Sequence, residues 1–114
     1  MQIGYLTIFV HDLGAHKKFY KALGLSFVEE QHGKGPVHYS ATVNHNMIFE
    51  IYPARISDMQ RTRESRRMGW VVSDPEEIFG RLAIAGYKPY KTSLGQLCVR
   101  DPDGCTIELL AKTP

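Results

Sequence analysis

The sequence predicts an α+β fold in which two β-α-β-β-β modules form a half-open, curled mixed sheet around a cavity, with the helices outside. Three observations support this fold. The 114 residues have room for only one domain of ordinary size; strand-like and helix-like stretches alternate along the chain; and the same order of stretches occurs twice. We therefore expect a single domain, 1–114, with modules at 1–52 and 67–114 and a linker at 53–66.

The composition narrows the range of functions. Hydrophobic residues make up 43% and charged residues 23% of the chain, as in folded globular proteins. Fourteen basic residues against twelve acidic ones leave a formal charge of +2, so we expect no nucleic-acid or membrane partner. The apolar runs are shorter than the roughly 18 residues that span a bilayer, and the N-terminus lacks the features of a signal peptide. These patterns favour a cytoplasmic protein.

The first module opens with a predicted strand and helix. Residues 3–10 are rich in β-branched and aromatic types, and Asp12 is a typical helix N-cap. Residues 13–23 place apolar side chains at helical spacing, and Gly24 is suited to the left-handed position that ends a helix. A strand at 25–30 is expected to follow.

Two further strands complete this module. They are expected at 37–43 and 47–52, after a loop at 31–36, with the Asn-rich residues 44–46 as the turn of a hairpin. This turn pairs the two strands in one register, which determines the side chains that share a face.

The second module repeats the pattern. After a strand at 68–72, Asp74 is predicted to cap a helix that has Pro75 at its first position and ends at Gly86. Twelve residues separate Asp74 from Gly86, as they separate the corresponding residues of the first module. The remaining strands are predicted at 87–91, 95–100 and 105–111, the last two joined by an Asp-Pro-Asp-Gly turn at 101–104.

Two other features have alternative interpretations. Cys98 and Cys105 lack the spacing of a zinc knuckle and are most simply buried thiols, although a bridge across the hairpin is an alternative. The linker at 53–66 carries four arginines, which predict a solvated connection or, alternatively, a lid that attracts anions.

The opening and closing segments resemble those of the vicinal oxygen chelate superfamily, which includes glyoxalase I, bleomycin-resistance proteins, fosfomycin-resistance enzymes and extradiol dioxygenases. The resemblance rests on the strand-Asp-helix-Leu-Gly segment from Phe9 to Leu25 and on the ending Asp-Pro-Asp-Gly-Cys-Thr-Ile-Glu-Leu from Asp101 to Leu109. It implies two modules around a shared cavity, commonly in a homodimer. A fold alone implies no particular activity.

Metal-dependent members of that superfamily use up to four ligands, one in the first strand and one in the last strand of each module. The last-strand positions match Glu50 and Glu108. The first-strand positions fall on Tyr5 and Arg67, or on Met68 with a shift of one residue, and none of these is an ordinary ligand of a divalent metal. We therefore expect the four-ligand site to be lost and no cofactor to be needed, with a divalent metal at Glu50 and Glu108 as the alternative.

Strand alternation predicts which side chains face the cavity. Leu6, Ile8, Val10, Met68, Trp70 and Val72 are expected under the helices, and Tyr5, Thr7, Phe9, Arg67, Gly69 and Val71 on the cavity side. The turn at 44–46 pairs Ser40 with Glu50 and brings His38, Glu50 and Tyr52 to one face. Because an unpaired buried carboxylate is unfavourable, we expect Tyr5 to donate to Glu50 and Arg67 to pair with Glu108.

Three classes of function are compatible with these residues. The favoured class is a protein that binds a small organic molecule, with a cavity lined by Tyr5, Phe9, His38, Glu50, Tyr52, Arg67 and Glu108. The alternative is a metal-dependent lyase, isomerase or dioxygenase that acts on a small substrate through the catalytic residues Glu50, Glu108 and His38. A third is an interaction module with a vestigial cavity. The other four histidines, His11, His16, His32 and His45, are expected in loops or on a helix surface, without a function.

Overall fold

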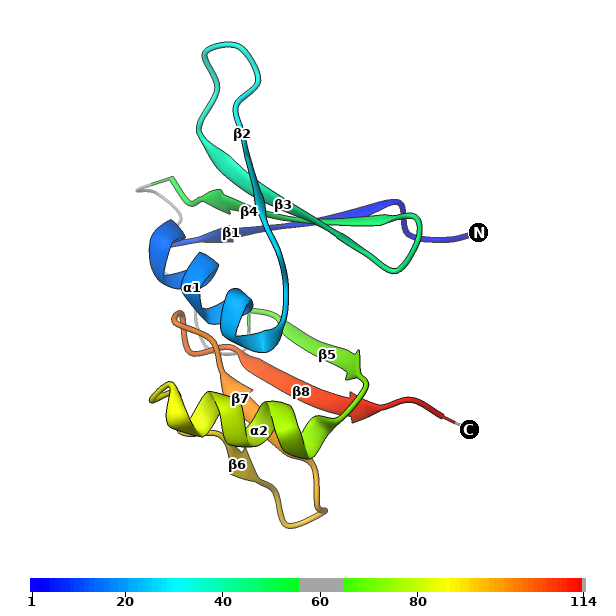
Figure 1. The fold of residues 1–114 in the computed structure, drawn as a ribbon. Helices are drawn as coiled ribbons and strands as arrows, with labels where there is room; N and C mark the ends of the chain where they lie inside the picture. Colours follow the sequence, from blue (N-terminus) through cyan, green and yellow to red (C-terminus); the bar gives the residue numbers. More distant parts are fainter. Residues whose placement is uncertain (56–64, 114) are drawn as a thin grey trace. The chain divides into compact units, whose positions relative to one another are not determined.

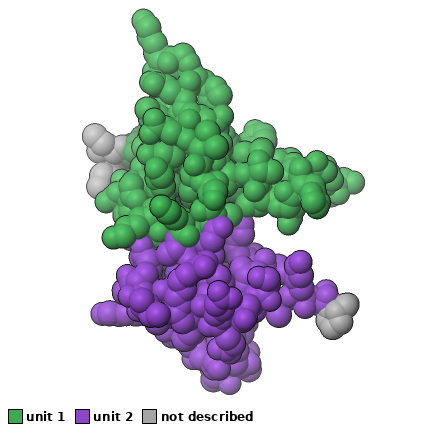
Figure 2. All heavy atoms as spheres, viewed as in Figure 1, with its two compact units in different colours: residues 1–21, 25–60 green, residues 22–24, 61–114 purple. Residues whose placement is uncertain are grey.

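The chain folds into two compact units. The structure, a computed structural model, describes residues 1–55 and 65–113. Unit 1 comprises Met1–Lys21 and Leu25–Gln60, and unit 2 comprises Ala22–Gly24 and Arg61–Pro114, as coloured in Figure 2. The linker arginines Arg61 and Arg63 lie outside the described residues.

Unit 1 contains a four-stranded mixed sheet with one helix. Its elements are β1 (Tyr5–Val10), α1 (Leu13–Leu23), β2 (Val28–Glu30), β3 (His38–Val43) and β4 (Met47–Pro53). The strand order is β1-β4-β3-β2, so that β1 and β4 lie side by side in Figure 1. This pair is parallel and the other two pairs are antiparallel.

Unit 2 has the same plan. Its elements are β5 (Arg67–Val72), α2 (Pro75–Ile84), β6 (Tyr90–Lys91), β7 (Leu97–Arg100) and β8 (Thr106–Ala111). The strand order β5-β8-β7-β6, with β5 parallel to β8, matches unit 1 position by position. The described residues therefore form two four-stranded mixed sheets and no closed barrel, which confirms the predicted duplicated α+β fold.

The predicted helix ends are also confirmed. The Asp12 carboxylate accepts a hydrogen bond from the backbone N–H of Ala15 at 2.9 Å, and the Asp74 carboxylate accepts one from that of Glu77 at 3.2 Å. After the helices, Gly24 and Gly86 have φ angles of 124° and 92°, which favour glycine. The cap residues therefore account for where each helix starts and stops.

The strands that follow the helices are shorter than predicted. They begin at Val28 and Tyr90, three residues later than expected. The reason is the turn that closes each helix, in which the residue after the glycine bonds back to the helix: the N–H of Leu25 donates to the carbonyl of Tyr20 at 2.9 Å. Residues in such a turn cannot pair with a neighbouring strand at the same time.

The core of unit 1 lies between α1 and one face of the sheet. Tyr20 of α1 is fully buried and meets the ring of Phe49 edge-on, with ring centroids 5.0 Å apart. Ile8 and Val10 of β1 are buried as predicted, but Leu6 is 37% exposed and does not belong to this core. Because Phe49 faces the helix, the next residue along β4, Glu50, faces the other side of the sheet.

His16 corrects one prediction. It was expected on a helix surface, but its side chain is fully buried and its Nδ1 lies 2.8 Å from the backbone carbonyl of Asp12. A histidine can be buried on an apolar helix face when a backbone carbonyl at the start of the same helix forms a hydrogen bond with its ring nitrogen.

The last arginine of the linker has a structural role in unit 2. Arg66 donates to the carboxylate of Asp101 at 2.8 Å and lies 3.3 Å from that of Asp103. The other oxygen of Asp101 accepts the backbone N–H groups of Asp103 and Cys105, at 3.0 and 2.9 Å. Arg66 is therefore neither a solvated connector nor part of a lid. Both cysteines are buried and free, so the alternative of a bridge is wrong.

Among the described residues, no helix is both long enough and apolar enough to cross a membrane.

Candidate functional site

A group of polar side chains lies on the face of the unit 1 sheet that carries Glu50, which we call the Glu50 face. The turn at 44–46 sets the predicted register, and Ser40 of β3 is opposite Glu50. On the other side of β4, Thr7 of β1 is the parallel partner of Glu50. The group thus draws on several strands whose backbones are fixed by ladder hydrogen bonds.

His38 is at the centre of this group. Its side chain is 1% exposed, and its Nδ1 lies 3.2 Å from the backbone carbonyl of Pro36. A carbonyl oxygen can only accept a hydrogen bond, so in the neutral ring Nδ1 carries the proton and Nε2 has a lone pair. The imidazole stacks on the ring of Tyr52, with centroids 4.0 Å apart and planes 10° apart, and the ring of His32 is 5.1 Å away.

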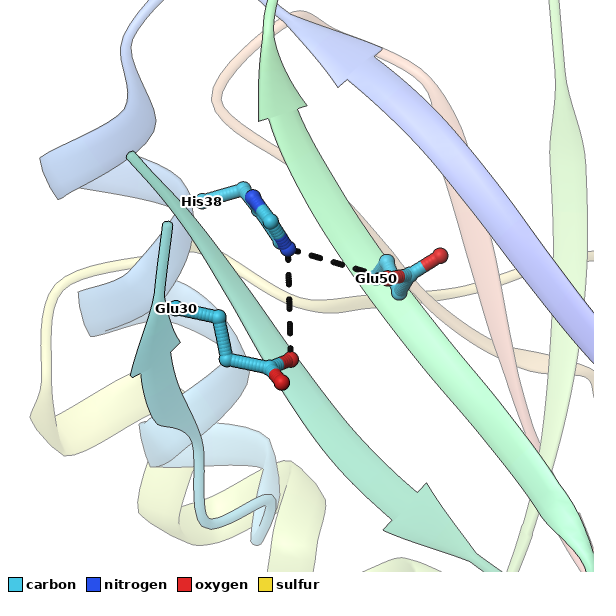
Figure 3. Close-up of side chains that lie close together, drawn as sticks. All are labelled: Glu30, His38 and Glu50. Atoms are coloured by element: carbon cyan, nitrogen blue, oxygen red, sulfur yellow. Dashed lines mark ion pairs between the residues drawn. The ribbon is translucent and has the colours of Figure 1, made fainter. Parts of the chain in front are cut away.

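Two carboxylates point toward Nε2 of His38. Oε2 of Glu50 is 3.8 Å from it and Oε1 of Glu30 is 3.9 Å from it. Figure 3 shows that the three side chains come from three adjacent strands and converge. One ligand atom from each lies within 4.8 Å of the others, and the side chains of Glu30 and Glu50 are 36% and 18% exposed. The group combines two oxygen donors with one nitrogen donor.

Hydroxyl groups orient both carboxylates. Thr7 donates to Oε1 of Glu50 at 2.8 Å, which leaves Oε2 of that carboxylate toward His38. Ser40 donates to Oε1 of Glu30. The predicted donor to Glu50 was Tyr5, but the donor in the structure is Thr7, because it is the direct partner of Glu50 in the ladder, whereas Tyr5 is opposite Ile48.

Aromatic rings flank the group. The rings of Phe9 and Tyr52 are 5.8 Å apart, and Phe9 is 42% exposed. The pKa of Tyr52 is raised by burial, and further by the charges of Glu50 and Glu30 and by Tyr5. The Tyr52 side chain is therefore a neutral phenol near pH 7, which offers a hydrogen-bond donor beside an apolar ring.

The second unit has a different set of residues at the same places. The strand pairing of the two units gives the correspondence residue by residue. In unit 2, Thr7 is replaced by Gly69, Phe9 by Val71, Glu30 by Thr92, His38 by Gln96, Ser40 by Cys98 and Tyr52 by Leu110. Only Glu50 has an identical counterpart, Glu108, which is the partner of Gly69 and Cys98. Since unit 2 has the same fold without these residues, the fold alone does not require them in unit 1.

Glu108 has its own partner. Arg67 donates to its Oε1 at 3.3 Å, which confirms the predicted pair, and the two side chains are 57% and 19% exposed. Glu108 also lines a hollow of about 330 Å³ in unit 2, together with Glu76, Gln96 and Leu110. Met68 is the partner of Ile107 and lies on the opposite side of the strand from Arg67, so the alternative alignment through Met68 is wrong.

The structure brings together some of the predicted site residues and adds others. His38, Glu50, Tyr52 and Phe9 meet in unit 1 as predicted, and Arg67 meets Glu108 in unit 2. Tyr5 is 69% exposed, at one end of β1. A cavity lined by residues of both units stays a prediction.

Sequence reasoning missed Glu30. It belongs to β2, where it is the direct partner of His38. The signal was present, because a loop at 31–37 that connects two paired strands places residue 30 opposite residue 38.

Comparisons with known proteins identify the fold. No family model and no curated protein sequence matches the chain. Several solved structures do match. The oxidase ChaP-H2 has a TM-score of 0.75 and 19% sequence identity, and the match covers 99% of this chain and 94% of that one. The trypanothione-dependent glyoxalase I of Leishmania major has a TM-score of 0.76 and 21% identity, with 97% of this chain and 86% of that one covered. TnmS3, an antibiotic-binding protein of a Streptomyces species, has a TM-score of 0.73 and 20% identity, with 99% of this chain and 97% of that one covered. The chain shares the fold of these proteins, which is the fold that the resemblance of its opening and closing motifs predicted.

Two of the four ligand positions implied by the superfamily resemblance carry side chains that are not ordinary metal ligands. Arg67 presents a guanidinium to Glu108, and a guanidinium has no lone pair to give to a metal. Tyr5 carries a phenol in place of the usual imidazole or amide. Among the described residues, Glu30, His38 and Glu50 are a group whose donor atoms could hold a cation.

Proposed function

We propose that this protein binds a small organic molecule on the Glu50 face of unit 1, in the manner of glyoxalase and bleomycin-resistance proteins but without their full four-ligand metal site. The observation that carries the proposal is that the stacked rings of His38 and Tyr52 lie beside the exposed ring of Phe9 and near the carboxylates of Glu30 and Glu50. Exposed ring surface next to a few fixed polar groups is the usual composition of a ligand site.

The residue types suggest which molecules would bind. The exposed parts of Phe9 and Tyr5 offer stacking area to an aromatic or conjugated ring. The two carboxylates favour a ligand that carries hydrogen-bond donors or a positive charge. One structural neighbour is an antibiotic-binding protein, so a natural product with aromatic and amine groups is a reasonable first probe.

A thermal-shift screen tests the proposal. The panel contains metal-free bleomycin, aromatic natural products that bear amines, and the glutathione adduct of methylglyoxal, all in the presence of a chelator. A ligand at 100 times its dissociation constant stabilises a protein by about 2.7 kcal/mol, so a binder raises the melting temperature visibly. We expect at least one compound to do so.

Two variants locate the binding. Tyr52→Leu introduces the residue that unit 2 has at that place, and it should abolish the rise in melting temperature. Lys91→Ala, which alters an exposed side chain of unit 2, should leave the rise unchanged. The proposal is wrong if no compound stabilises the protein, or if Tyr52→Leu binds as well as the original chain.

A second candidate is a metal-dependent lyase, isomerase or dioxygenase that uses Glu50, His38 and Glu108. It is favoured by the distance of 3.8 Å between His38 and Glu50, which suits proton transfer through one bridging group. Turnover of the methylglyoxal–glutathione adduct with added nickel or zinc tests the glyoxalase branch. Loss of that turnover in Glu50→Gln would assign it to this site.

The setting and assembly of the protein are part of the same proposal. The two buried free cysteines suit a reducing compartment such as the cytoplasm. The predicted homodimer is part of this proposal, because the superfamily that the chain resembles commonly forms one. Light scattering during size-exclusion chromatography should give twice the chain mass.

A further inference from the structure

We propose that Glu30, His38 and Glu50 form a binding site for one first-row divalent cation, such as Zn²⁺ or Co²⁺, entirely within unit 1. This goes beyond the binding of an organic molecule. It also departs from the ligand positions of the superfamily, since Glu30 and His38 belong to β2 and β3 and only Glu50 occupies one of those positions.

The donor set defines the class of metal. Carboxylate oxygens suit hard cations and an imidazole nitrogen suits zinc, iron, cobalt and nickel, so a mixed set favours these over magnesium or calcium. Three protein ligands also leave at least one coordination position for water or a bound molecule, as in catalytic rather than structural zinc sites.

The spacing of the donors is close to what such a cation needs. Ligands about 2.1 Å from a tetrahedral zinc lie about 3.4 Å from one another. Nε2 of His38 is 3.8 Å from Glu50 and 3.9 Å from Glu30, and all three ligand atoms lie within 4.8 Å of one another, so side-chain rotations that bring the two carboxylates closer together would complete the site. The strands that carry the three residues need not move.

The lone pair of His38 is available to a metal. The carbonyl of Pro36 holds the proton on Nδ1, which is the outer contact that fixes histidine ligands in known metal sites. The hydroxyl of Tyr52 is 3.2 Å from Nε2, but the two rings are stacked, so it approaches from above the imidazole plane. The in-plane lone pair therefore remains directed toward the group.

Each carboxylate accepts a hydrogen bond from a hydroxyl group. Thr7 donates to Oε1 of Glu50 and leaves Oε2 for a cation, and Ser40 donates to Oε1 of Glu30, the oxygen that faces His38. Hydrogen bonds of this kind orient carboxylate ligands and reduce the entropy that they lose when a metal binds. The carboxylates of Glu30 and Glu50, whose ligand atoms lie within 4.8 Å of each other, also repel one another, and a divalent cation would remove that repulsion.

Comparison of the two units shows that the fold itself does not require the proposed ligands and their supporting hydroxyls. In unit 2 the places of Glu30 and His38 are taken by Thr92 and Gln96, and those of the two orienting hydroxyls by Cys98 and Gly69. Two of the three ligands and both supporting hydroxyls are thus absent together from unit 2, which keeps only the counterpart of Glu50, and are present together in unit 1. A set required only for packing would not be expected to vary as a group.

Titration of the full chain with Co²⁺ tests the proposal, after dialysis against a chelator and then against buffer without one. Calorimetry gives the stoichiometry and affinity, and the visible absorption of bound Co²⁺ reports its ligands. We expect one ion per chain in unit 1. Glu30→Gln and His38→Gln should each weaken binding by more than about 10-fold, since loss of outer contacts alone has such effects.

Matched variants and separate readouts make the outcome decisive. Glu76→Gln alters an exposed glutamate of unit 2 and should leave Co²⁺ affinity unchanged. Because the Glu30 side chain is 36% exposed, Glu30→Gln should fold normally, and far-ultraviolet circular dichroism checks this. The site is wrong if Co²⁺ does not bind the original chain, if Glu30→Gln binds it equally well, or if Glu76→Gln abolishes binding. Binding of the organic probes is measured with chelator present, so either proposal can fail without the other.

Discussion

Individual residues of the Glu50 face illustrate how burial and charge set chemical properties. Tyr52 stacks on His38 and lies near two carboxylates, and its burial and the charges of these carboxylates disfavour a phenolate. Burial contributes most to its raised pKa, followed by Glu50 and Glu30. The phenol therefore binds its proton more tightly in the folded chain than in the unfolded one.

This difference predicts how stability changes at alkaline pH. Because the pKa of Tyr52 is higher in the folded chain than its value of 10.0 in the unfolded chain, the protonated phenol stabilises the fold. This stabilisation is complete below pH 10.0 and is lost as the pH rises through the pKa of the folded chain. In Tyr52→Phe, the free energy of unfolding should fall less between pH 8 and about 11, as measured by urea unfolding. Tyr39, whose pKa is raised by burial and by Glu29, should account for part of the remaining loss. An unchanged pH profile in Tyr52→Phe would contradict the assignment.

The candidate site could be predicted only in part. His38, Glu50 and Tyr52 were placed together because an Asn-rich turn of three residues leaves one register for the hairpin. The orienting role of Thr7 depends on the parallel pairing of β1 with β4, which brings together residues far apart in the sequence. No local sequence pattern determines the register of such a parallel strand pair to within one residue.

At the scale of elements, the turn between β7 and β8 is held by one carboxylate. Asp101 accepts two backbone N–H groups and the guanidinium of Arg66, and its side chain is fully buried. Burial lowers the pKa of Arg66, but the paired carboxylate outweighs this and raises it overall, so the cation persists. The turn motif that suggested the superfamily thus has a structural role in this chain.

Removal of this carboxylate should be strongly destabilising. Breaking a buried ion pair from one side leaves an uncompensated charge, so we expect Asp101→Ala to lower the free energy of unfolding by about 3 kcal/mol or more. Lys91→Ala is the control, because its ion pair with Glu76 is exposed and 3.9 Å long and should contribute less than about 1 kcal/mol. Urea unfolding of both variants checks the difference, and similar losses would argue against a buried pair.

The helix caps give a smaller effect. Asp74→Ala removes the acceptor of the Glu77 N–H at the start of α2, where Pro75 has no N–H to satisfy. Loss of an N-cap typically lowers stability by about 1 kcal/mol. Asp74→Asn retains an acceptor oxygen and should recover most of this loss. The prediction fails if Asp74→Ala is as stable as the original chain.

At the scale of the whole molecule, the duplication provides an internal control for function. Both units build the same sheet, but only one carries the polar group and its supports. The double variant His38→Gln and Tyr52→Leu, which copies unit 2, should still unfold in one cooperative transition while losing the binding of organic probes. Thermal unfolding followed by circular dichroism tests this, and loss of the cooperative transition would show that the fold depends on these residues.

The fold itself was largely predictable, because each of its determinants is local. Asp caps, Pro75 and the glycines after both helices specify where the helices begin and end, and the repeated spacing reveals the duplication. The lengths of β2 and β6 were not predictable, because strand propensity does not show which residues a helix-closing turn will occupy. The burial of His16 was missed because its partner is a backbone carbonyl.

Gly69 is the place in unit 2 that corresponds to Thr7 of unit 1. A Cβ at Gly69 would lie 2.8 Å from Cδ1 of Leu110, so a larger residue there requires the leucine side chain to shift. Leu110 is 37% exposed and the contact is with the end of its side chain, so a rotation of that side chain makes room. The single substitution Gly69→Thr should therefore be accommodated and should place a hydroxyl beside Glu108, as Thr7 does beside Glu50.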